Sequence, residues 1–226
     1  MPESLTDLTG SFYDLEISGQ TLRLHAGRFA EWREEKTLFV ADAHLGKIEH
    51  FRRAGLSLPD QAGTDTFSRL SASMEKHLPE RLIFLGDLFH SDFNDDFPRF
   101  AAWRNRYPAT DVMLIPGNHD RAGQKHLHHL GIRVESPQLL GPFYLRHEPG
   151  ETENGFLLCG HLHPAVSLSG KGRQHLRMPA FWLSKAMLCL PSFGSFTGSA
   201  SIHPAADDVF FAIAGSAVRR IPGSIL

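Results

Sequence analysis

Apolar residues in the first half of the chain recur at the spacing of strands and of helices in turn. Residues 11–25 alternate apolar and polar positions around Gly19, as a β-hairpin does. Phe67, Leu70 and Met74 lie at helical spacing on one face of a predicted helix. The pattern predicts strands at residues 37–41, 81–85, 111–115 and 132–135, and helices at 45–54, 60–78, 95–107 and 122–130. Each strand ends in a polar loop, where ligands bind in open α/β sheets.

The second half of the chain changes to short strands with few helical patterns between them. These strands are predicted near residues 143–147, 156–160, 165–169, 175–183, 186–190 and 208–213, mainly in antiparallel pairs. Together the halves predict an α/β fold in which two sheets pack face to face with helices outside. At 226 residues the chain suits one domain over residues 1–226.

Charge limits the ways in which the chain can bind a partner. The formal net charge is −2, so a strongly basic fold that holds nucleic acid by its overall field is not indicated. A nuclease remains compatible with this charge, because metal ions can supply positive charge locally. The 14 histidines are consistent with either surface residues or a metal site.

Cysteine usage and hydropathy favour a soluble cytoplasmic protein. Cys159 and Cys189 lie in apolar runs and give neither metal-thiolate spacing nor a disulfide framework, so we expect both to be buried. The first residues lack the basic and apolar regions of a signal peptide. The longest apolar stretch, residues 209–218, is about half a membrane span, so no membrane association is expected.

Potential metal ligands follow five of the apolar runs. Each loop alone has an ordinary reading, such as a polar strand end or a Gly-Asp turn. Five such accidents along one chain are improbable together, and mixed imidazole and oxygen ligands suit Mn, Fe or Zn better than Mg or Ca. The loops read Asp42-Ala-His44, Gly86-Asp87, Gly117-Asn118-His119-Asp120, His147 and Gly160-His161-Leu162-His163.

This order of motifs resembles that of the calcineurin-like metallophosphoesterases, over residues 42–163. The resemblance implies a four-layer αββα sandwich of two mixed β-sheets flanked by helices, with two divalent metal ions. It also implies that Asp87 bridges the ions. The resemblance assigns Asp42, His44, Asp87 and His163 to one ion, and Asp87, Asn118, His147 and His161 to the other.

Further motifs resemble the bacterial ligase-associated DNA damage response endonuclease family (PdeM). This resemblance implies a DNA endonuclease in DNA repair, associated with an ATP-dependent DNA ligase, a helicase and an exonuclease. The motifs are Asp42-Ala-His-Leu-Gly-Lys47, the stretch from Phe51 to Pro59, Gly86-Asp-Leu-Phe-His90, Met178-Pro-Ala-Phe-Trp182 and Leu190-Pro-Ser-Phe-Gly-Ser-Phe-Thr-Gly198.

The expected chemistry is hydrolysis of a phosphodiester by a hydroxide that bridges two metal ions. The expected metal is Mn, and Fe and Zn are the alternatives. His119 is not needed as a ligand and is predicted to face the leaving oxygen. Asp120 has two open roles, orienting the His119 ring or capping the helix that follows. His90 resembles a histidine that lies beside the scissile phosphate in the double-strand-break repair nuclease, and a partly buried turn histidine is the alternative interpretation.

Other features of the sequence carry weaker predictions. A basic segment after the first loop can hold phosphates or form a solvated helix face. A histidine-rich segment resembles a metal patch only superficially, and several aromatic residues can stack on bases or pack in the core. The three groups are Lys47, His50, Arg52 and Arg53; Lys125, His126, His128 and His129; and Phe181, Trp182, Phe193 and Phe196.

Two rival functions remain open from the sequence. The chain could act on a nucleotide or another small phosphodiester, since the metal loops alone do not select the substrate. It could also be a non-catalytic metal-binding scaffold, although relatives of that kind usually lose a ligand or the catalytic histidine. The sequence also leaves homo-oligomerisation open.

Overall fold

The computed structural model describes residues 11–47, 61–90, 96–120, 124–169, 175–195, 197–198, 200 and 202–225. Most of the predicted helix at 45–54 and all of the motif from Phe51 to Pro59 lie outside these ranges. The basic residues His50, Arg52 and Arg53, and the aromatic Phe196, lie outside them as well.

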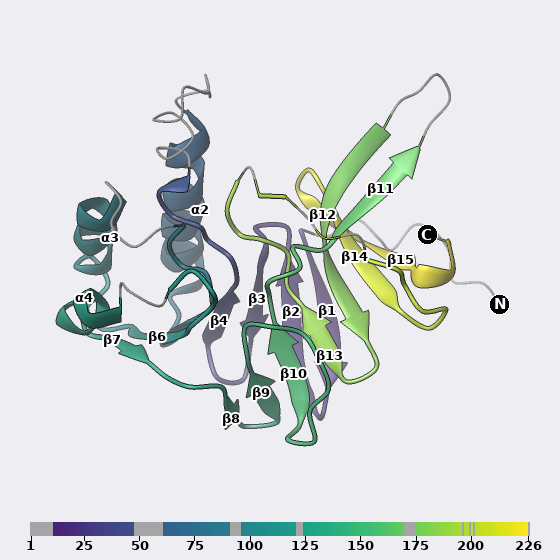
Figure 1. Cartoon of the computed structure of the whole chain (residues 1–226), viewed down its shortest axis with the longest axis horizontal. Coiled ribbons are helices and arrows are strands. Elements are labelled where there is room, and N and C mark those ends of the chain that lie inside the picture. The colour runs from purple at the N-terminus through teal and green to yellow at the C-terminus, as the bar shows by residue number, and fades with distance from the viewer. Residues whose placement is uncertain are drawn as a thin grey trace.

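The first sheet has seven strands in the order of the sequence, and it is mixed (Figure 1). Its first four strands pair antiparallel, beginning with the hairpin predicted around Gly19. From β4 onward the pairs are parallel. The strands are β1 (Phe12–Ile17), β2 (Gln20–His25), β3 (Phe29–Trp32), β4 (Thr37–Val40), β5 (Arg81–Leu85), β6 (Asp111–Ile115) and β7 (Ile132–Val134).

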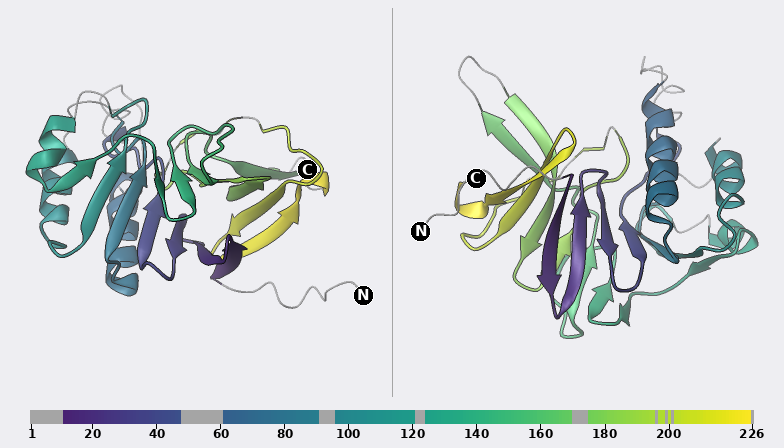
Figure 2. Two further views of the ribbon diagram at one scale, coloured as in Figure 1. Left: turned by 90° about the horizontal axis from the view of Figure 1, so that it is seen from below. Right: turned by 180° about the vertical axis from the view of Figure 1, so that it is seen from behind.

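Three described helices cover the outer face of the first sheet, because each buries an apolar stripe there. They are α2 (Gln61–His77), α3 (Asp96–Arg104) and α4 (Gln124–His129). Phe67 and Leu70 of α2, and Phe100 of α3, join one core cluster with the outward-facing residues of β4 and β5. Figure 2 shows these helices on the side of the first sheet that faces away from the second. Their positions agree with the predicted helices to within three residues.

The second sheet has eight strands and is also mixed. Most of its pairs are antiparallel, as predicted, but β10 runs parallel to both β9 and β13. Part of β12 pairs instead with β11, and the two project as a hairpin (Figure 1). The strands are β8 (Gln138–Leu140), β9 (Phe143–Leu145), β10 (Phe156–Cys159), β11 (Ala165–Ser169), β12 (His175–Ser184), β13 (Met187–Cys189), β14 (Val209–Ala214) and β15 (Ala217–Pro222), followed by the 3-10 turn η1 (Gly223–Ile225).

The two sheets pack against each other through one apolar core. Phe39 and Ile83 of the first sheet, and Phe143, Phe181 and Phe211 of the second, are each 1% exposed or less and belong to it. The predicted α/β fold of two mixed sheets packed face to face with flanking helices is therefore confirmed. Cys159 and Cys189 are buried and free, as predicted.

Sheet topology brings the candidate ligands to one place. The parallel strands β4, β5 and β6 end at the same edge, and their following loops carry Asp42, Asp87 and the turn before Asp120. In the second sheet β9 and β10 are parallel neighbours, so the loops after them also meet. A hydrogen bond of 2.8 Å from the His161 N–H to Asp42 Oδ2 joins the loops of the two sheets.

No helix among the described residues has the length and apolar character needed to span a bilayer.

Candidate metal centre

Five of the seven predicted ligands have a backbone conformation that is uncommon for residues with side chains. Their φ angles lie between 44° and 72°, and the described chain has ten non-glycine residues with positive φ in all. Such a conformation costs roughly 1–3 kcal/mol per residue and gathers at functional sites. The packed ends of the sheets therefore hold these side chains in one arrangement. The five are Asp42, His44, Asp87, His161 and His163.

The imidazoles form two close pairs. Nε2 of His44 lies 3.3 Å from Nε2 of His163, and Nδ1 of His161 lies 3.1 Å from Nε2 of His147. Two ligand nitrogens at about 2.0–2.1 Å from one metal ion are typically separated by roughly 3–3.5 Å. Each pair therefore has the spacing of two ligands on one ion.

Asp87 lies between the two imidazole pairs. Its Oδ2 atom is 3.6 Å from Nε2 of His147 and 4.0 Å from Nε2 of His44. Its Oδ1 atom accepts a 3.0 Å hydrogen bond from the His119 N–H. The carboxylate is thus fixed by the backbone on one side and faces both pairs on the other.

Hydrogen bonds to carbonyl groups determine which ring nitrogens can bind a cation. Nδ1 of His147 lies 2.9 Å from the Leu85 carbonyl, and Nδ1 of His163 lies 2.9 Å from the Gly198 carbonyl. A carbonyl only accepts, so Nδ1 carries a proton in both rings, and in the neutral form of each ring Nε2 has the lone pair. Both Nε2 atoms point toward the carboxylates, as metal ligands would.

Two further observations fit a cation at this position. Asp42 Oδ1 is buried and accepts no hydrogen bond from the part of the chain that the structure describes, although His163 Nε2 lies 3.4 Å away. A buried carboxylate oxygen without a donor is costly unless a cation neutralises it. Burial, together with the neighbouring His163 and Lys47, lowers the pKa of His44 to about 2, so its imidazole is neutral and able to coordinate.

Asp120 ties the site together through the main chain. Its Oδ2 atom accepts hydrogen bonds from the N–H groups of Asp87 and Gly117, at 2.7 Å and 2.8 Å. Its Oδ1 atom accepts a 3.0 Å hydrogen bond from the Leu88 N–H. Burial raises the pKa of this carboxyl, and the charge of Asp87 adds to the effect. The structure thus gives Asp120 backbone partners in the loops after β5 and β6, and no hydrogen bond to the His119 ring among the described residues.

His119 and His90 lie together beside the centre. The His119 side chain is 47% exposed, with Nε2 at 4.0 Å from Asp87 Oδ2. The two rings are stacked, with centroids 5.6 Å apart and an interplanar angle of 27°. Asn118 is exposed in the same turn as His119. The rings of His119 and His90 therefore lie at the opening of the site, outside the buried carboxylates.

Gly117 is required by the close approach of Asp87. A Cβ atom at Gly117 would lie 2.3 Å from Asp87 Oδ1 and 2.9 Å from His147 Nε2. We therefore expect Gly117→Ala to displace the Asp87 carboxylate and to lower diesterase activity about 100-fold, the usual cost of a misplacement near 1 Å. Metal content by mass spectrometry and kcat/KM on a diester measure this effect.

Gly19→Ala is the matched control for that substitution. Gly19 lies in the β1–β2 turn with φ of 74° and nothing within 4 Å of an added Cβ. It should cost about 1 kcal/mol of stability through its backbone conformation, with activity and metal content unchanged. Equal activity losses in the two variants would contradict the steric argument.

The weaker sequence predictions have mixed outcomes. Phe181 and Phe193 are fully buried, so they pack in the core and are not available for stacking on bases. Trp182 donates its indole N–H to Asp208. Lys47 is half-buried near the centre, where burial lowers its pKa against the opposing charges of Asp87 and Asp42. His126, His128 and His129 are exposed and form no metal-ligating group among the described residues.

One cluster of titratable residues was not predicted from the sequence. His25 Nε2 lies 2.8 Å from Glu31 Oε2, and His77 Nδ1 lies 3.3 Å from the same oxygen. These residues come from β2, β3 and the end of α2. They are far apart in the sequence and share no motif, so only the packing of α2 on the sheet reveals the cluster.

This cluster should make stability depend on pH. Burial lowers the pKa of His25 to about 4, with His77 and Arg23 adding to the effect and Glu31 opposing it. The unfolded chain then binds more protons than the folded one between about pH 6.5 and 4, so stability falls as the pH falls through this window. His25→Gln should reduce the loss of unfolding free energy between pH 7 and pH 4.5 by about 2–3 kcal/mol, as measured by urea unfolding. A loss that matches the wild-type loss would contradict this assignment, and His128→Gln serves as the exposed control.

Comparisons with known proteins agree with this geometry. Residues 35–181 match the calcineurin-like phosphoesterase family. The crystal structure of a Pseudomonas putida nuclease, MPE, aligns with a TM-score of 0.79 at 32% identity, over 93% of this chain and 100% of that one. A phosphoesterase from E. coli, Yfce, aligns over 82% of this chain and 98% of its own, with 15% identity and a TM-score of only 0.44. No curated protein matches the chain significantly. The chain therefore belongs to the calcineurin-like phosphoesterase family and is a metal-dependent phosphoesterase.

Proposed function

We propose that the chain is a binuclear metal-dependent phosphodiesterase that hydrolyses DNA, as an endonuclease in DNA repair. The observation that carries the binuclear part is the position of Asp87 Oδ2 between two imidazole pairs, at 3.6 Å from His147 and 4.0 Å from His44. DNA as substrate is supported by the similarity to the Pseudomonas putida nuclease, which covers nearly the whole chain.

The proposed ligand sets follow the two imidazole pairs. Asp87 belongs to both sets as the bridging carboxylate. When bound, two divalent ions in these sets supply a water of lowered pKa as nucleophile and stabilise charge on the phosphoryl oxygens. Imidazole with carboxylate and amide oxygen favours manganese, with iron or zinc as alternatives. One set is Asp42, His44, Asp87 and His163, and the other is Asp87, Asn118, His147 and His161.

Side chains beside the ligands would handle the substrate. The His119 ring is exposed at the opening of the centre, where it can give a proton or a hydrogen bond to the leaving oxygen. The ring of His90, which stacks on that of His119, would contact a phosphoryl oxygen of the same substrate. Asp120 acts as a positioning residue, because its three backbone hydrogen bonds hold Asp87 and the Gly117 turn in register.

The biological setting extends the proposal beyond the site. The resemblance to the ligase-associated endonucleases supports a cytoplasmic role in DNA repair, with an ATP-dependent DNA ligase, a helicase and an exonuclease as functional partners. Co-purification of the ligase with the tagged chain from its own cells is the direct test of that association.

The substrate panel tests the catalytic proposal. Purified protein with Mn²⁺ is offered bis-p-nitrophenyl phosphate, the corresponding monoester, and single- and double-stranded DNA. We expect hydrolysis of the diester and of DNA that stops when the metal is removed by chelation. Activity on the monoester alone would overturn the nuclease assignment, and hydrolysis of the small diester without DNA cleavage would favour a nucleotide substrate. Metal binding without any hydrolysis would indicate a scaffold.

A further inference from the structure

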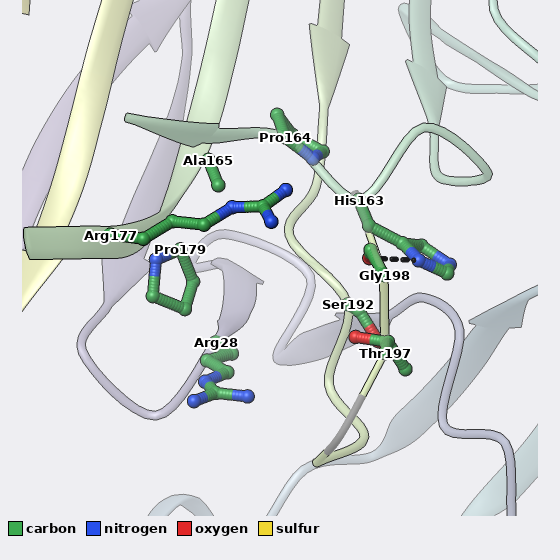
Figure 3. Close-up of a pocket in the computed structure, with 9 residues that line it drawn as sticks. All are labelled: Arg28, His163, Pro164, Ala165, Arg177, Pro179, Ser192, Thr197 and Gly198. Carbon is green, nitrogen blue, oxygen red and sulfur yellow. Dashed lines mark hydrogen bonds between the residues drawn. The ribbon is translucent and has the colours of Figure 1, made fainter. Parts of the chain in front are cut away.

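A basic pocket opens directly beside the candidate metal centre. It has a volume of about 250 Å³, below the range of roughly 300–1,000 Å³ that encloses a whole small molecule. A pocket of this size suits one part of a longer substrate. Its lining residues are Arg28, His163, Pro164, Ala165, Arg177, Pro179, Ser192, Thr197 and Gly198 (Figure 3).

The pocket is physically joined to the metal centre. His163 lines the pocket, and its Nε2 atom also lies 3.4 Å from Asp42 Oδ1. Ser192 forms another part of the lining and donates a 2.8 Å hydrogen bond to the Asp42 carbonyl. A long substrate with one phosphate at the metal centre can therefore extend into this pocket while it stays in contact with the protein surface.

Arg28 is held in place on one side of the pocket. It lies in the turn between β2 and β3 with φ of 65°, and its Nη1 donates a 3.0 Å hydrogen bond to the Gly194 carbonyl. A guanidinium presents its N–H donors in a rigid fork, so a bond to a carbonyl fixes the orientation of the group. A fixed guanidinium binds an anion at a lower entropy cost than a mobile one.

Arg177 supplies a second guanidinium from a different element. It belongs to β12, opposite Ser167 of β11, and Figure 3 shows its side chain extending past Pro179 toward Pro164. The residue is exposed, and no carboxylate of the described residues forms an ion pair with it. Arg28 and Arg177 thus line the same pocket from different parts of the chain.

The chemistry of the lining selects the ligand. The pocket has two guanidinium groups and no acidic side chain, and guanidinium groups recognise phosphate oxygens in a bidentate manner. Its other walls include the apolar Pro164 and Pro179, which suit the sugar of a nucleotide. A larger pocket on the second sheet carries Glu151, Glu153 and Asp208 with a single lysine, so it would repel a polyanion.

We propose that this pocket is a backbone subsite, in which Arg28 and Arg177 bind the DNA phosphate next to the scissile one. The inference rests on the proposed function and adds the position of the DNA segment next to the scissile phosphate. With a net charge of −2, the chain has no general positive field to hold DNA, so binding depends on local cations of this kind.

Binding of a fluorescent oligonucleotide, followed by anisotropy over a range of salt concentrations, tests the subsite. Each phosphate contact contributes about 0.7 to the slope of log affinity against log salt for a single strand, which is about fivefold in affinity at 0.1 M salt. Because both arginines bind one phosphate, Arg177→Gln and Arg28→Gln should each lose part of this slope and affinity, and the double variant should lose about 0.7 in slope, the whole contact.

Arg220→Gln is the matched control, because Arg220 is an exposed arginine on β15, outside the pocket. It removes the same charge and should bind the oligonucleotide as the wild type does. Arg28 and Arg177 variants that behave like Arg220→Gln would overturn the subsite. Hydrolysis of bis-p-nitrophenyl phosphate by the wild-type protein is measured separately. Its absence would overturn the proposed function, while the binding data would still decide the subsite.

Discussion

Asp87→Asn is expected to remove both metal ions and to lower diester hydrolysis by at least about 1,000-fold. The asparagine keeps the shape of the side chain and can still accept the hydrogen bond from the His119 N–H. It loses the negative charge, and its amide N–H₂ can face Nε2 of His147, which lies 3.6 Å from Asp87 Oδ2. A loss of several kcal/mol of charge stabilisation corresponds to a rate factor of about this size.

The same variant should not destabilise the metal-free protein. Asp87 is 4% exposed, and a buried carboxylate without its cation is costly. Metal-free Asp87→Asn should therefore melt at or above the temperature of the metal-free wild type. Added Mn²⁺ should raise the melting temperature of the wild type alone, because only a bound ligand shifts the folding equilibrium.

Asp111→Asn provides the control for the loss of a carboxylate. Asp111 begins β6, at the opposite end of that strand from the centre, and pairs with Arg133 at 2.7 Å on the surface. Exposed pairs contribute about 0–1 kcal/mol, so this variant should retain two metal ions and full activity. An Asp87→Asn protein that holds two Mn²⁺ ions and remains active would contradict the bridging role.

The fold was predictable where the sequence pattern and the packing agree. Strands β5 and β6 match their predicted residues because each is a buried parallel strand and reads as a continuous apolar run. Strands β8 and β15 were not predicted. β15 mixes polar and apolar residues at the edge of its sheet, and β8 has three residues with none fully buried. Edge strands bury too little apolar surface to leave a clear pattern.

The candidate ligands were predictable for a related reason. Each follows a buried strand, and the order of the strands in the sheets brings their ends together. The role of Asp120 was less accessible from the sequence, since its partners are backbone N–H groups in a loop 32 and 33 residues away. A motif identifies a side chain, but it does not identify which main-chain groups that side chain will meet.

The two arginines of the basic pocket show the same limit. Arg28 and Arg177 are 149 residues apart in number and belong to different sheets. Arg28 is flanked by Gly27 and Phe29, whereas Arg177 ends a segment that also carries Lys171, Arg173 and His175. Charge patterning along the chain therefore does not connect the two arginines. Only the packing of the two sheets, with the β11–β12 hairpin beside His163, places both guanidinium groups at one pocket.

His119→Ala should lower kcat for diester hydrolysis by about 100- to 10,000-fold, the usual contribution of a positioned proton donor. The substitution removes the exposed ring but leaves the His119 N–H on Asp87 Oδ1, so metal content should stay at that of the wild type. His128→Ala, which alters an exposed histidine of α4, is the control and should not change kcat.

The size of this loss should depend on the leaving group, which separates proton donation from simple charge stabilisation. p-Nitrophenolate leaves readily without a proton, whereas the sugar oxygen of DNA needs one. If His119 donates a proton, His119→Ala should impair DNA cleavage much more than hydrolysis of bis-p-nitrophenyl phosphate. An equal loss on both substrates would assign the ring to stabilising charge on the phosphoryl group. No loss on either would remove His119 from the mechanism and leave the stacked His90 as the remaining imidazole beside the centre.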